Sequence, residues 1–198
     1  METAISTFAI AVFSYAIGAA VAGYYLTYWR TGRDVRQTGS GTAGARNAAR
    51  LLGTRHGALV FGWDFAKGAI VALAAIAVHA NEPQIGMAAT AVVVGHVWPA
   101  QLKFNGGKGV APAAGAFIVW QPSILAVVAV AYLLARLANQ NVEKSALLAF
   151  GAGILLSPVL VSSARAAVFC VLILAILSWT HRFGLFQSDR RSGQGDAR

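Results

Sequence analysis

Two glycine-rich stretches of this sequence carry cations and hydroxyls at spacings that suit phosphate binding. The first, TGSGTAGARN, covers residues 38–47 and is followed by Arg50. Glycines let backbone N–H groups turn toward an anion, and a helix start adds partial positive charge. Ser40 supplies a hydroxyl, while Arg46 and Arg50, four residues apart on a helix, can both reach phosphate oxygens. The alternative is a flexible loop whose arginines meet lipid phosphates.

The same stretch spells GxGxxG from Gly39 to Gly44, the pattern of a dinucleotide-binding turn. That turn requires a buried strand before the glycines and a helix after them. Here residues 5–28 form one long apolar run that ends in an arginine-rich segment, which is typical of a membrane helix leaving the bilayer. The sequence therefore does not predict a nucleotide-binding βαβ unit.

The second stretch, GHVWPAQLKFNGGKGVAP, runs over residues 95–112. Its GGKG core resembles a P-loop, but GxxxxGK[ST] fails because Leu102 takes the first glycine position and Gly109 takes the hydroxyl position. An NTPase is therefore not predicted, whereas a glycine-lined anion nest with Lys108 at its centre is. His96, in the apolar run before it, could be a general base or a polar group bonded to a backbone carbonyl.

A third feature is the pair Asp64 and Lys67 in WDFAKG, inside an apolar run. Residues three apart lie on one helix face, and ionisable groups within a span usually face the bundle interior and serve a site. The alternative is a self-neutralising pair that only locks helices together. We favour a site-supporting role, in which Asp64 orients Lys67 or a neighbouring arginine.

The composition excludes most soluble protein classes. With 57% hydrophobic and 12% charged residues among 198, the chain has too few charges to cover a soluble globule. The net charge of +9 is expected to set membrane topology and to contact lipid headgroups, so no nucleic-acid partner is predicted. The single cysteine, Cys170, excludes a disulfide framework and a CxxC metal site within one chain.

The apolar runs predict an all-α, polytopic membrane bundle of about seven transmembrane helices, since one crossing needs about 20 residues. The N-terminal run is longer than the apolar part of a signal peptide, so we expect it to be retained. The fourth run is short enough to be re-entrant. The predicted spans are residues 5–28, 57–79, 85–102, 109–121, 123–138, 145–160 and 165–180.

Lysine and arginine cluster after the first, third and fifth predicted spans and in the tail, whereas the intervening turns hold almost none. Because positive loops stay on the cytoplasmic side, the N-terminus is predicted outside and the C-terminus inside. Both glycine-rich stretches then lie on the cytoplasmic face. Residues 185–198 are polar and are predicted to form a disordered cytoplasmic tail.

Four motifs in fixed order resemble the PlsY family of acyl-phosphate:glycerol-3-phosphate acyltransferases of the bacterial inner membrane. They are GxDxR (Gly32–Arg36), GSGxxGAxNxxR (Gly39–Arg50), DxxKG (Asp64–Gly68) and GHxxPxxxxFxGGKGVA (Gly95–Ala111). The resemblance implies that residues 1–184 form a single transmembrane acyltransferase domain. It implies transfer of a fatty acyl group from acyl phosphate to the 1-hydroxyl of glycerol 3-phosphate, giving lysophosphatidic acid for phospholipid synthesis. It also implies no metal, no other cofactor and no acyl-CoA.

Two phosphorylated substrates suit two anion nests on one membrane face. Lys108 and nearby N–H donors can stabilise the developing oxyanion and the departing phosphate. Ser40 is expected to bind a phosphate or to position the hydroxyl, and the donor phosphate can take the proton, since no Ser-His-Asp arrangement is evident. The resemblance implies that Ser40, Asn47, Arg50, Lys108 and the glycines of both stretches are functional positions. The catalytic candidates are Ser40, Asn47, Arg50, His96 and Lys108, and the substrate-binding candidates are Gly39, Gly41, Gly44, Arg46, Asp64, Lys67, Gly106, Gly107 and Gly109.

The chain departs from the family pattern at Thr42, Arg46 and Pro112, and at Gly184, where an Asn is usual. A family member with a changed acceptor is therefore one alternative. A non-enzymatic anion carrier or lipid-binding protein is another, but a carrier needs a polar path lined from both sides of the membrane. The predicted clusters lie on one side only. Besides the two substrates, membrane lipids are the expected partners, and the chain is expected to act as a monomer.

Overall fold

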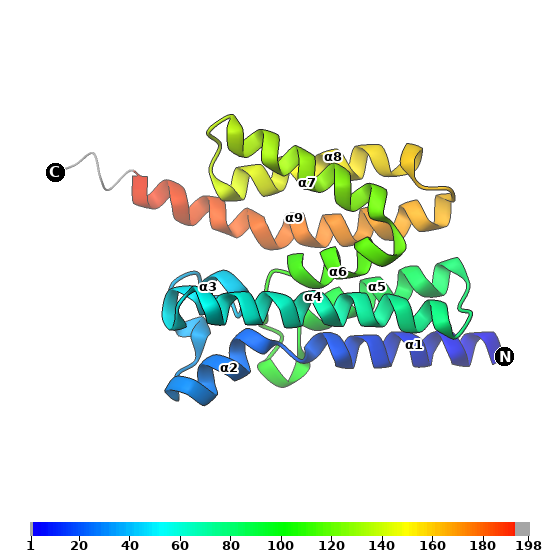
Figure 1. Ribbon diagram of the computed structural model, residues 1–198, viewed down its shortest axis with the longest axis horizontal. Helices are drawn as coiled ribbons and strands as arrows, with labels where there is room; N and C mark the ends of the chain where they lie inside the picture. Colours follow the sequence, from blue (N-terminus) through cyan, green and yellow to red (C-terminus); the bar gives the residue numbers. More distant parts are fainter. Residues whose placement is uncertain (1, 193–198) are drawn as a thin grey trace. The chain divides into compact units, whose positions relative to one another are not determined.

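The computed structural model describes the backbone of residues 2–192 and the side chains of residues 6–182, and all regular structure in this part is helical (Figure 1). The chain forms two compact units, Met1–Pro122 and Ser123–Arg198. The first contains α1 (Glu2–Ala19), α2 (Ala22–Thr31), η1 (Val35–Gln37), α3 (Ala45–Leu52), α4 (Thr54–Ala77), α5 (Glu82–Val97), η2 (Ala100–Leu102) and α6 (Val110–Trp120). It is followed by α7 (Pro122–Leu137), α8 (Val142–Leu160) and α9 (Ala164–Ser192).

Helices occupy all the predicted spans, so the all-α prediction is confirmed for the described residues. Five helical segments of this part are long and apolar enough to cross a membrane: Ser6–Thr31, Thr54–Ala77, Glu82–Leu102, Val142–Leu160 and Ala164–Arg182. The fourth and fifth predicted spans are the shorter apolar helices Val110–Trp120 and Pro122–Leu137. At 1.5 Å per residue, α6 is only about 16 Å long, well below the thickness of the hydrocarbon core. The number of crossings and the orientation of the termini stay predictions.

The first predicted span is not one helix, because the chain breaks between α1 and α2. A break inside an apolar segment frees carbonyl oxygens that lipid cannot satisfy. Side chains from distant positions bond them instead. Lys67 Nζ donates to the carbonyl oxygens of Gly18 at 2.8 Å and Ala20 at 3.1 Å. Gln101 Nε2 donates to the carbonyl oxygen of Ala19 at 2.6 Å. Polar residues of the later spans therefore stabilise the break.

Glycines allow very close packing between two helix pairs of the first unit, α4 with α6 and α1 with α5, which lie side by side in Figure 1. A Cβ on Gly68 would lie 2.0 Å from the carbonyl oxygen of Pro112, and one on Gly115 would lie 1.9 Å from that of Phe65. Small residues at crossing points of this kind are typical of membrane helix packing. The equivalent contacts between α1 and α5 are Gly18 against Val92 and Gly95 against Tyr15.

The second unit is built around the packing of α8 against α9. His181 on α9 lies edge-on to Phe150 on α8, with ring centroids 5.2 Å apart. Its Nδ1 lies 2.8 Å from the carbonyl oxygen of Leu177, one helical turn earlier. Cys170 is buried in the same unit. The ring contact between His181 and Phe150 therefore joins α9 to α8.

Helix α9 includes residues 185–192, where the sequence predicts the beginning of a disordered tail. Residues 193–198 lie outside the described residues, as do the side chains from residue 183 onward. The described backbone therefore differs from the tail prediction over residues 185–192. The assignment of residues 1–184 to a single domain stays a prediction.

Candidate functional site

The first glycine loop, residues 38–44, joins η1 to α3 and is held in shape by Asn47. This side chain is only 1% exposed. Its Nδ2 donates to the carbonyl oxygens of Val35, Thr38 and Thr42 at 2.8, 2.9 and 3.0 Å, and its Oδ1 accepts from the Ser40 backbone N–H at 3.1 Å. An amide has two N–H donors and one carbonyl acceptor, so the hydrogen-bonding groups of Asn47 are all engaged by the loop. Asn47 therefore shapes the loop, and its predicted role in catalysis stays untested.

Two glycines of this loop adopt conformations that favour glycine. Gly39 has φ +57° and Gly41 has φ +70°, both in the left-handed region. A Cβ on Gly39 would also lie 2.2 Å from Asn47 Oδ1 and 3.7 Å from Arg50 Cδ. Gly44 is extended, with φ −84°, and precedes the first residue of α3. A helix start carries partial positive charge that suits an anion, although the Asn47 N–H of this first turn donates to the Gly44 carbonyl oxygen at 3.0 Å.

The second glycine loop, residues 103–109, uses its glycines differently from the prediction. The N–H groups of Gly106 and Gly107 donate to the carbonyl oxygens of Val97 and His96, each at 3.0 Å. They are therefore committed to the end of α5 and are not open to an anion. A Cβ would lie 2.1 Å from the His96 carbonyl oxygen at Gly106 and 2.1 Å from His96 Nε2 at Gly107. Gly106 and Gly107 therefore allow the backbone of this loop to approach His96 closely. The first N–H groups of α6, which begins after Gly109, have no acceptor within the helix and are the ones that could meet an anion.

The two glycine loops meet directly. The backbone N–H of Ala43 in the first glycine loop donates to the carbonyl oxygen of Gly106 in the second at 3.0 Å. Val35, Ala43 and Leu102 belong to one buried apolar cluster beneath this contact. Ala43 and Gly106 lie more than 60 residues apart in the sequence. The structure therefore joins the two predicted anion-binding stretches in one region of the first unit.

Arg36, in η1 just before the first glycine loop, bonds the chain at Leu102 and Asn105 in and ahead of the second glycine loop. Its Nε and Nη2 donate to Asp34 carboxylate oxygens at 3.0 and 2.7 Å, and its Nη1 donates to the carbonyl oxygens of Leu102 at 2.7 Å and Asn105 at 2.9 Å. The guanidinium carbon also lies 5.0 Å from the centre of the Tyr24 ring. Hydrogen bonding within the ion pair lowers the pKa of Asp34 and raises the pKa of Arg36. Arg36 therefore fixes the chain that enters the second glycine loop.

Beside the second glycine loop lies a buried cluster of Asp64, Lys67 and His96. Their side chains come from α4 and α5, and the three residues are 1%, 3% and 3% exposed. Lys67 Nζ lies 2.9 Å from Asp64 Oδ1 and 2.9 Å from His96 Nδ1. The predicted pairing of Asp64 with Lys67 is therefore present, and it includes His96. Whether any of the three contacts a substrate stays a prediction.

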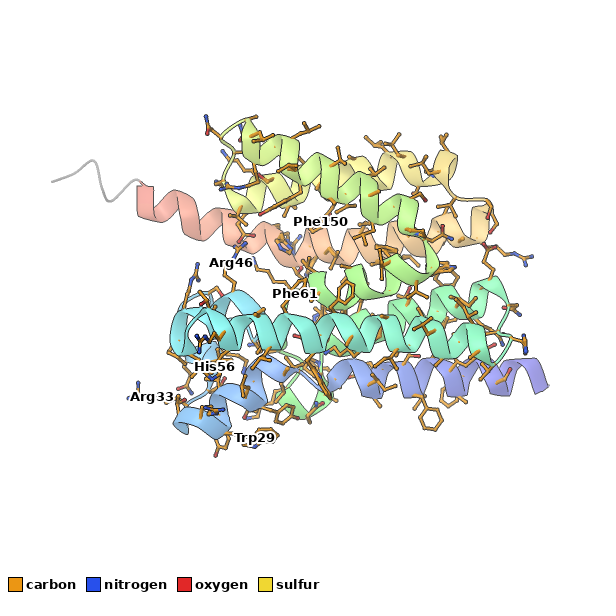
Figure 2. All side chains as sticks on the ribbon, viewed as in Figure 1. Trp29, Arg33, Arg46, His56, Phe61 and Phe150 are labelled. Carbon is orange, nitrogen blue, oxygen red and sulfur yellow. The ribbon has the colours of Figure 1, made fainter. Side chains whose placement is uncertain are left out.

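The remaining predicted cations lie around the loops. Arg46 and Arg50 are both exposed on α3, one turn apart, and Arg46 is labelled in Figure 2. Arg50 makes no hydrogen bond or ion pair with any residue whose side chain is described. Lys108 is half-buried and directly follows Gly107. Ser40 Oγ lies 3.1 Å from Thr42 Oγ1, so two hydroxyl groups of the first glycine loop form a hydrogen-bonded pair.

The comparisons with known proteins identify the family of this chain. Residues 8–185 match the family model described as glycerol-3-phosphate acyltransferase. The chain belongs to this family. A glycerol-3-phosphate acyltransferase from Myxococcus xanthus is 36% identical over 188 residues, covering 94% of this chain and 97% of that protein. Glycerol-3-phosphate acyltransferase 1 from Desulfitobacterium hafniense is 33% identical over 186 residues, covering 91% and 90%.

The fold is also that of an integral membrane acyltransferase of the family. A crystal structure of PlsY, described as an integral membrane glycerol 3-phosphate acyltransferase in its glycerol 3-phosphate form, superposes with a TM-score of 0.83 at 30% identity. The match covers 92% of this chain and 91% of that one. The lysophosphatidic acid form gives a TM-score of 0.80 at 28% identity. This glycerol-3-phosphate acyltransferase family member is therefore a multi-pass membrane protein.

Sequence reasoning included the GxDxR motif only as part of the family resemblance and missed the role of Asp34 and Arg36. An acidic and a basic residue two positions apart in this motif indicate an ion pair. The motif does not show that Arg36 also bonds the backbone at Leu102 and Asn105. Gln101 was missed in the same way. Among the described residues, no three His, Cys, Asp or Glu side chains gather as a metal site would require.

The structure shows the surroundings of three residues at which the chain departs from the family pattern. Thr42 provides the hydroxyl beside Ser40. Pro112 lies on α6 where its carbonyl oxygen packs against Gly68 of α4. Arg46 is exposed on the first turn of α3. Gly184 lies in the part of α9 whose side chains are not described.

Proposed function

We propose that this protein transfers a fatty acyl group from acyl phosphate to the 1-hydroxyl of glycerol 3-phosphate and releases lysophosphatidic acid. Membership of the family supports the acceptor. The observation that carries the proposal for the site is the hydrogen bond from Ala43 N–H to the Gly106 carbonyl oxygen, since it joins the loop that precedes Arg46 and Arg50 of α3 to the loop that contains Lys108. We further propose that the site faces the cytoplasm from the bacterial inner membrane and that the chain acts as a monomer.

The reaction needs two anions held side by side at the edge of the bilayer. Arg50 Cδ lies 3.7 Å from the position of a Cβ on Gly39, and the half-buried Lys108 belongs to the second glycine loop. The starts of α3 and α6 add partial positive charge. Such groups hold phosphates and bring the acceptor hydroxyl to the acyl carbon, and proximity of this kind supplies a large part of catalysis. Ser40 and Thr42 add hydroxyls that orient the acceptor or its phosphate.

In the proposed step the 1-hydroxyl oxygen forms a bond to the acyl carbon, and the bond from that carbon to the phosphate oxygen breaks. The departing phosphate takes the hydroxyl proton, so no residue has to act as a base. Lys108 stabilises negative charge on the oxyanion and on the departing phosphate. No covalent Ser40 intermediate is needed, because phosphate is already a good leaving group.

Asn47, Asp64 and Lys67 are positioning residues in this proposal. Asn47 engages its amide with the first glycine loop, and Lys67 bonds the break between α1 and α2 as well as His96. Their loss would move the loops that bind substrate. The predicted contact of Asp64 and Lys67 with substrate is replaced by this indirect role.

The test is a phosphate-release assay with purified protein, acyl phosphate and a panel of phosphorylated and unphosphorylated polyols. Release should depend on glycerol 3-phosphate, and lysophosphatidic acid should appear in equal amount. Lys108→Ala and Ser40→Ala should abolish turnover, while Lys144→Ala, an exposed lysine on α8, should not. Release with another acceptor alone would identify a changed substrate. No acceptor-dependent release from folded protein would contradict the proposal.

A further inference from the structure

Lys67 uses each of its three N–H donors in a hydrogen bond. The acceptors are the Gly18 carbonyl oxygen at 2.8 Å, the Ala20 carbonyl oxygen at 3.1 Å and His96 Nδ1 at 2.9 Å. Asp64 Oδ1 lies 2.9 Å from the same nitrogen as an ion pair, but it accepts no hydrogen bond from the described residues. An ammonium group has three donors and no acceptor. Lys67 can therefore only donate to His96.

This contact decides which ring nitrogen of His96 carries the proton. A nitrogen that accepts from an ammonium must have a free lone pair, so the proton of the neutral ring lies on Nε2. The other tautomer would have Nδ1–H donate to Asp64 Oδ1. That pair of atoms is 3.5 Å apart, and the Nδ1–H would be directed near the lysine charge. The 2.9 Å contact to Lys67 favours the Nε2–H form.

The Nε2 atom faces the second glycine loop. A Cβ on Gly107 would lie 2.1 Å from it, so the ring approaches this loop as closely as a glycine permits. Nε2 makes no hydrogen bond to any residue in the described part of the chain. Gly107 directly precedes Lys108, the cation at the centre of the loop. An N–H at this position lies against Gly107, the residue before Lys108.

We propose that Lys67 is a positioning residue that fixes His96 as the Nε2–H tautomer, and that His96 donates a hydrogen bond to a substrate oxygen at the second glycine loop. His96 is then a donor and not a general base. Lys67 also bonds the break between α1 and α2, so one ammonium connects that break to the loop through His96. The hydrogen bond from His96 to a substrate oxygen rests on the proposed function, whereas the Nε2–H tautomer does not.

The tautomer can be measured without any activity. Full-length protein labelled with ¹⁵N-histidine, in detergent micelles near neutral pH, is compared with His96→Gln to assign the His96 signals among the four histidines. The expected result is an Nε2 shift of a protonated nitrogen and an Nδ1 shift of an unprotonated one. Lys67→Met should weaken this preference, while Lys144→Met should leave it unchanged. An unprotonated Nε2 in the wild type would overturn the proposal.

Kinetics test the donor role. Glutamine keeps an N–H donor but cannot act as a base, so His96→Gln should retain at least about tenfold more kcat than His96→Leu, given that loss of one oxyanion donor costs about 100-fold or more. Equal losses in both variants, with both folded, would overturn the donor role. An inactive wild type that shows the expected nitrogen shifts would instead refute the proposed function and leave the tautomer established.

Discussion

The two glycine loops are held by different means. The first glycine loop depends on one buried side chain, Asn47, which bonds four backbone groups. The second depends on backbone hydrogen bonds from Gly106 and Gly107 to the end of α5, with Arg36 fixing the chain ahead of it. A loop held by one amide should fail when that amide is lost. A loop held by several separate contacts should lose its shape gradually as single contacts are removed.

The largest effect should follow from Asn47→Ala. The change leaves several buried or half-buried backbone groups without partners, and each such group costs about 1–3 kcal/mol. Displacement of Ser40 by about 1 Å would lower kcat/KM by about 100-fold. The measurement is kcat/KM for glycerol 3-phosphate together with the thermal unfolding midpoint. Unchanged activity would show that the first glycine loop does not depend on Asn47.

Two further variants sharpen this test. Asn47→Asp retains an acceptor for the Ser40 N–H but cannot donate to the three carbonyl oxygens, so it should be nearly as impaired as the alanine variant. Gln37→Ala removes an exposed amide from the neighbouring η1 and serves as the control. Activity that is normal in Asn47→Asp would contradict the role of the three donated bonds.

The glycine substitutions should rank next. In Gly39→Ala the new Cβ lies 2.2 Å from Asn47 Oδ1 at a φ of +57°, so steric conflict and backbone strain of about 1–2 kcal/mol both apply. In Gly107→Ala only the conflict with His96 Nε2 at 2.1 Å applies. Both should lower kcat/KM, the first by more. Gly151→Ala, whose Cβ would meet nothing within 4 Å, is the control. The reverse order would show that the second glycine loop is the less tolerant.

A smaller loss is expected from Arg36→Lys. Lysine keeps the charge but cannot bind Asp34 bidentately while also bonding the Leu102 and Asn105 carbonyl oxygens. The second glycine loop keeps its bonds to α5, so kcat/KM should fall by about tenfold, the effect of about 1.4 kcal/mol. Arg33→Lys, at an exposed position labelled in Figure 2, is the matched control. Identical losses in the two variants would rule out a specific role for Arg36.

The sequence predicts the helices and both glycine turns because these follow from local patterns. Length and apolarity determine the spans, and clustered glycines mark the loops. The break between α1 and α2 is not predictable in this way, since the side chains that stabilise it, Lys67 and Gln101, come from positions far along the chain. The use of the Gly106 and Gly107 N–H groups by α5 is likewise a tertiary contact.

Among the predicted site residues, those with a local partner were the easiest to interpret. The spacing of Asp64 and Lys67 alone predicted their pairing. Asn47 was selected by its place in a motif, and the structure adds what it bonds. His96 could be interpreted as a base or as a bonded polar group, because nothing in the sequence shows which residue meets Nδ1. The sequence thus identifies the candidate site residues, and the contacts in the structure indicate what each of them does.

The smallest expected effect is the loss of thermal stability at low pH. The pKa of Asp34 is lowered from its ordinary value of 3.8 by the hydrogen bond from Arg36, so the pair stabilises the fold above that value and is lost as the pH falls through the lower folded pKa. Asp34 and Arg36 side chains are 20% and 18% exposed, and partial exposure to solvent weakens the pair. The thermal midpoint of the wild type should therefore fall slightly more below about pH 4 than that of Asp34→Asn. Because Asp34 fixes Arg36 and not Asn47, the acid-sensitive part should be the second glycine loop. Parallel pH profiles for the two proteins would show that the pair adds no stability.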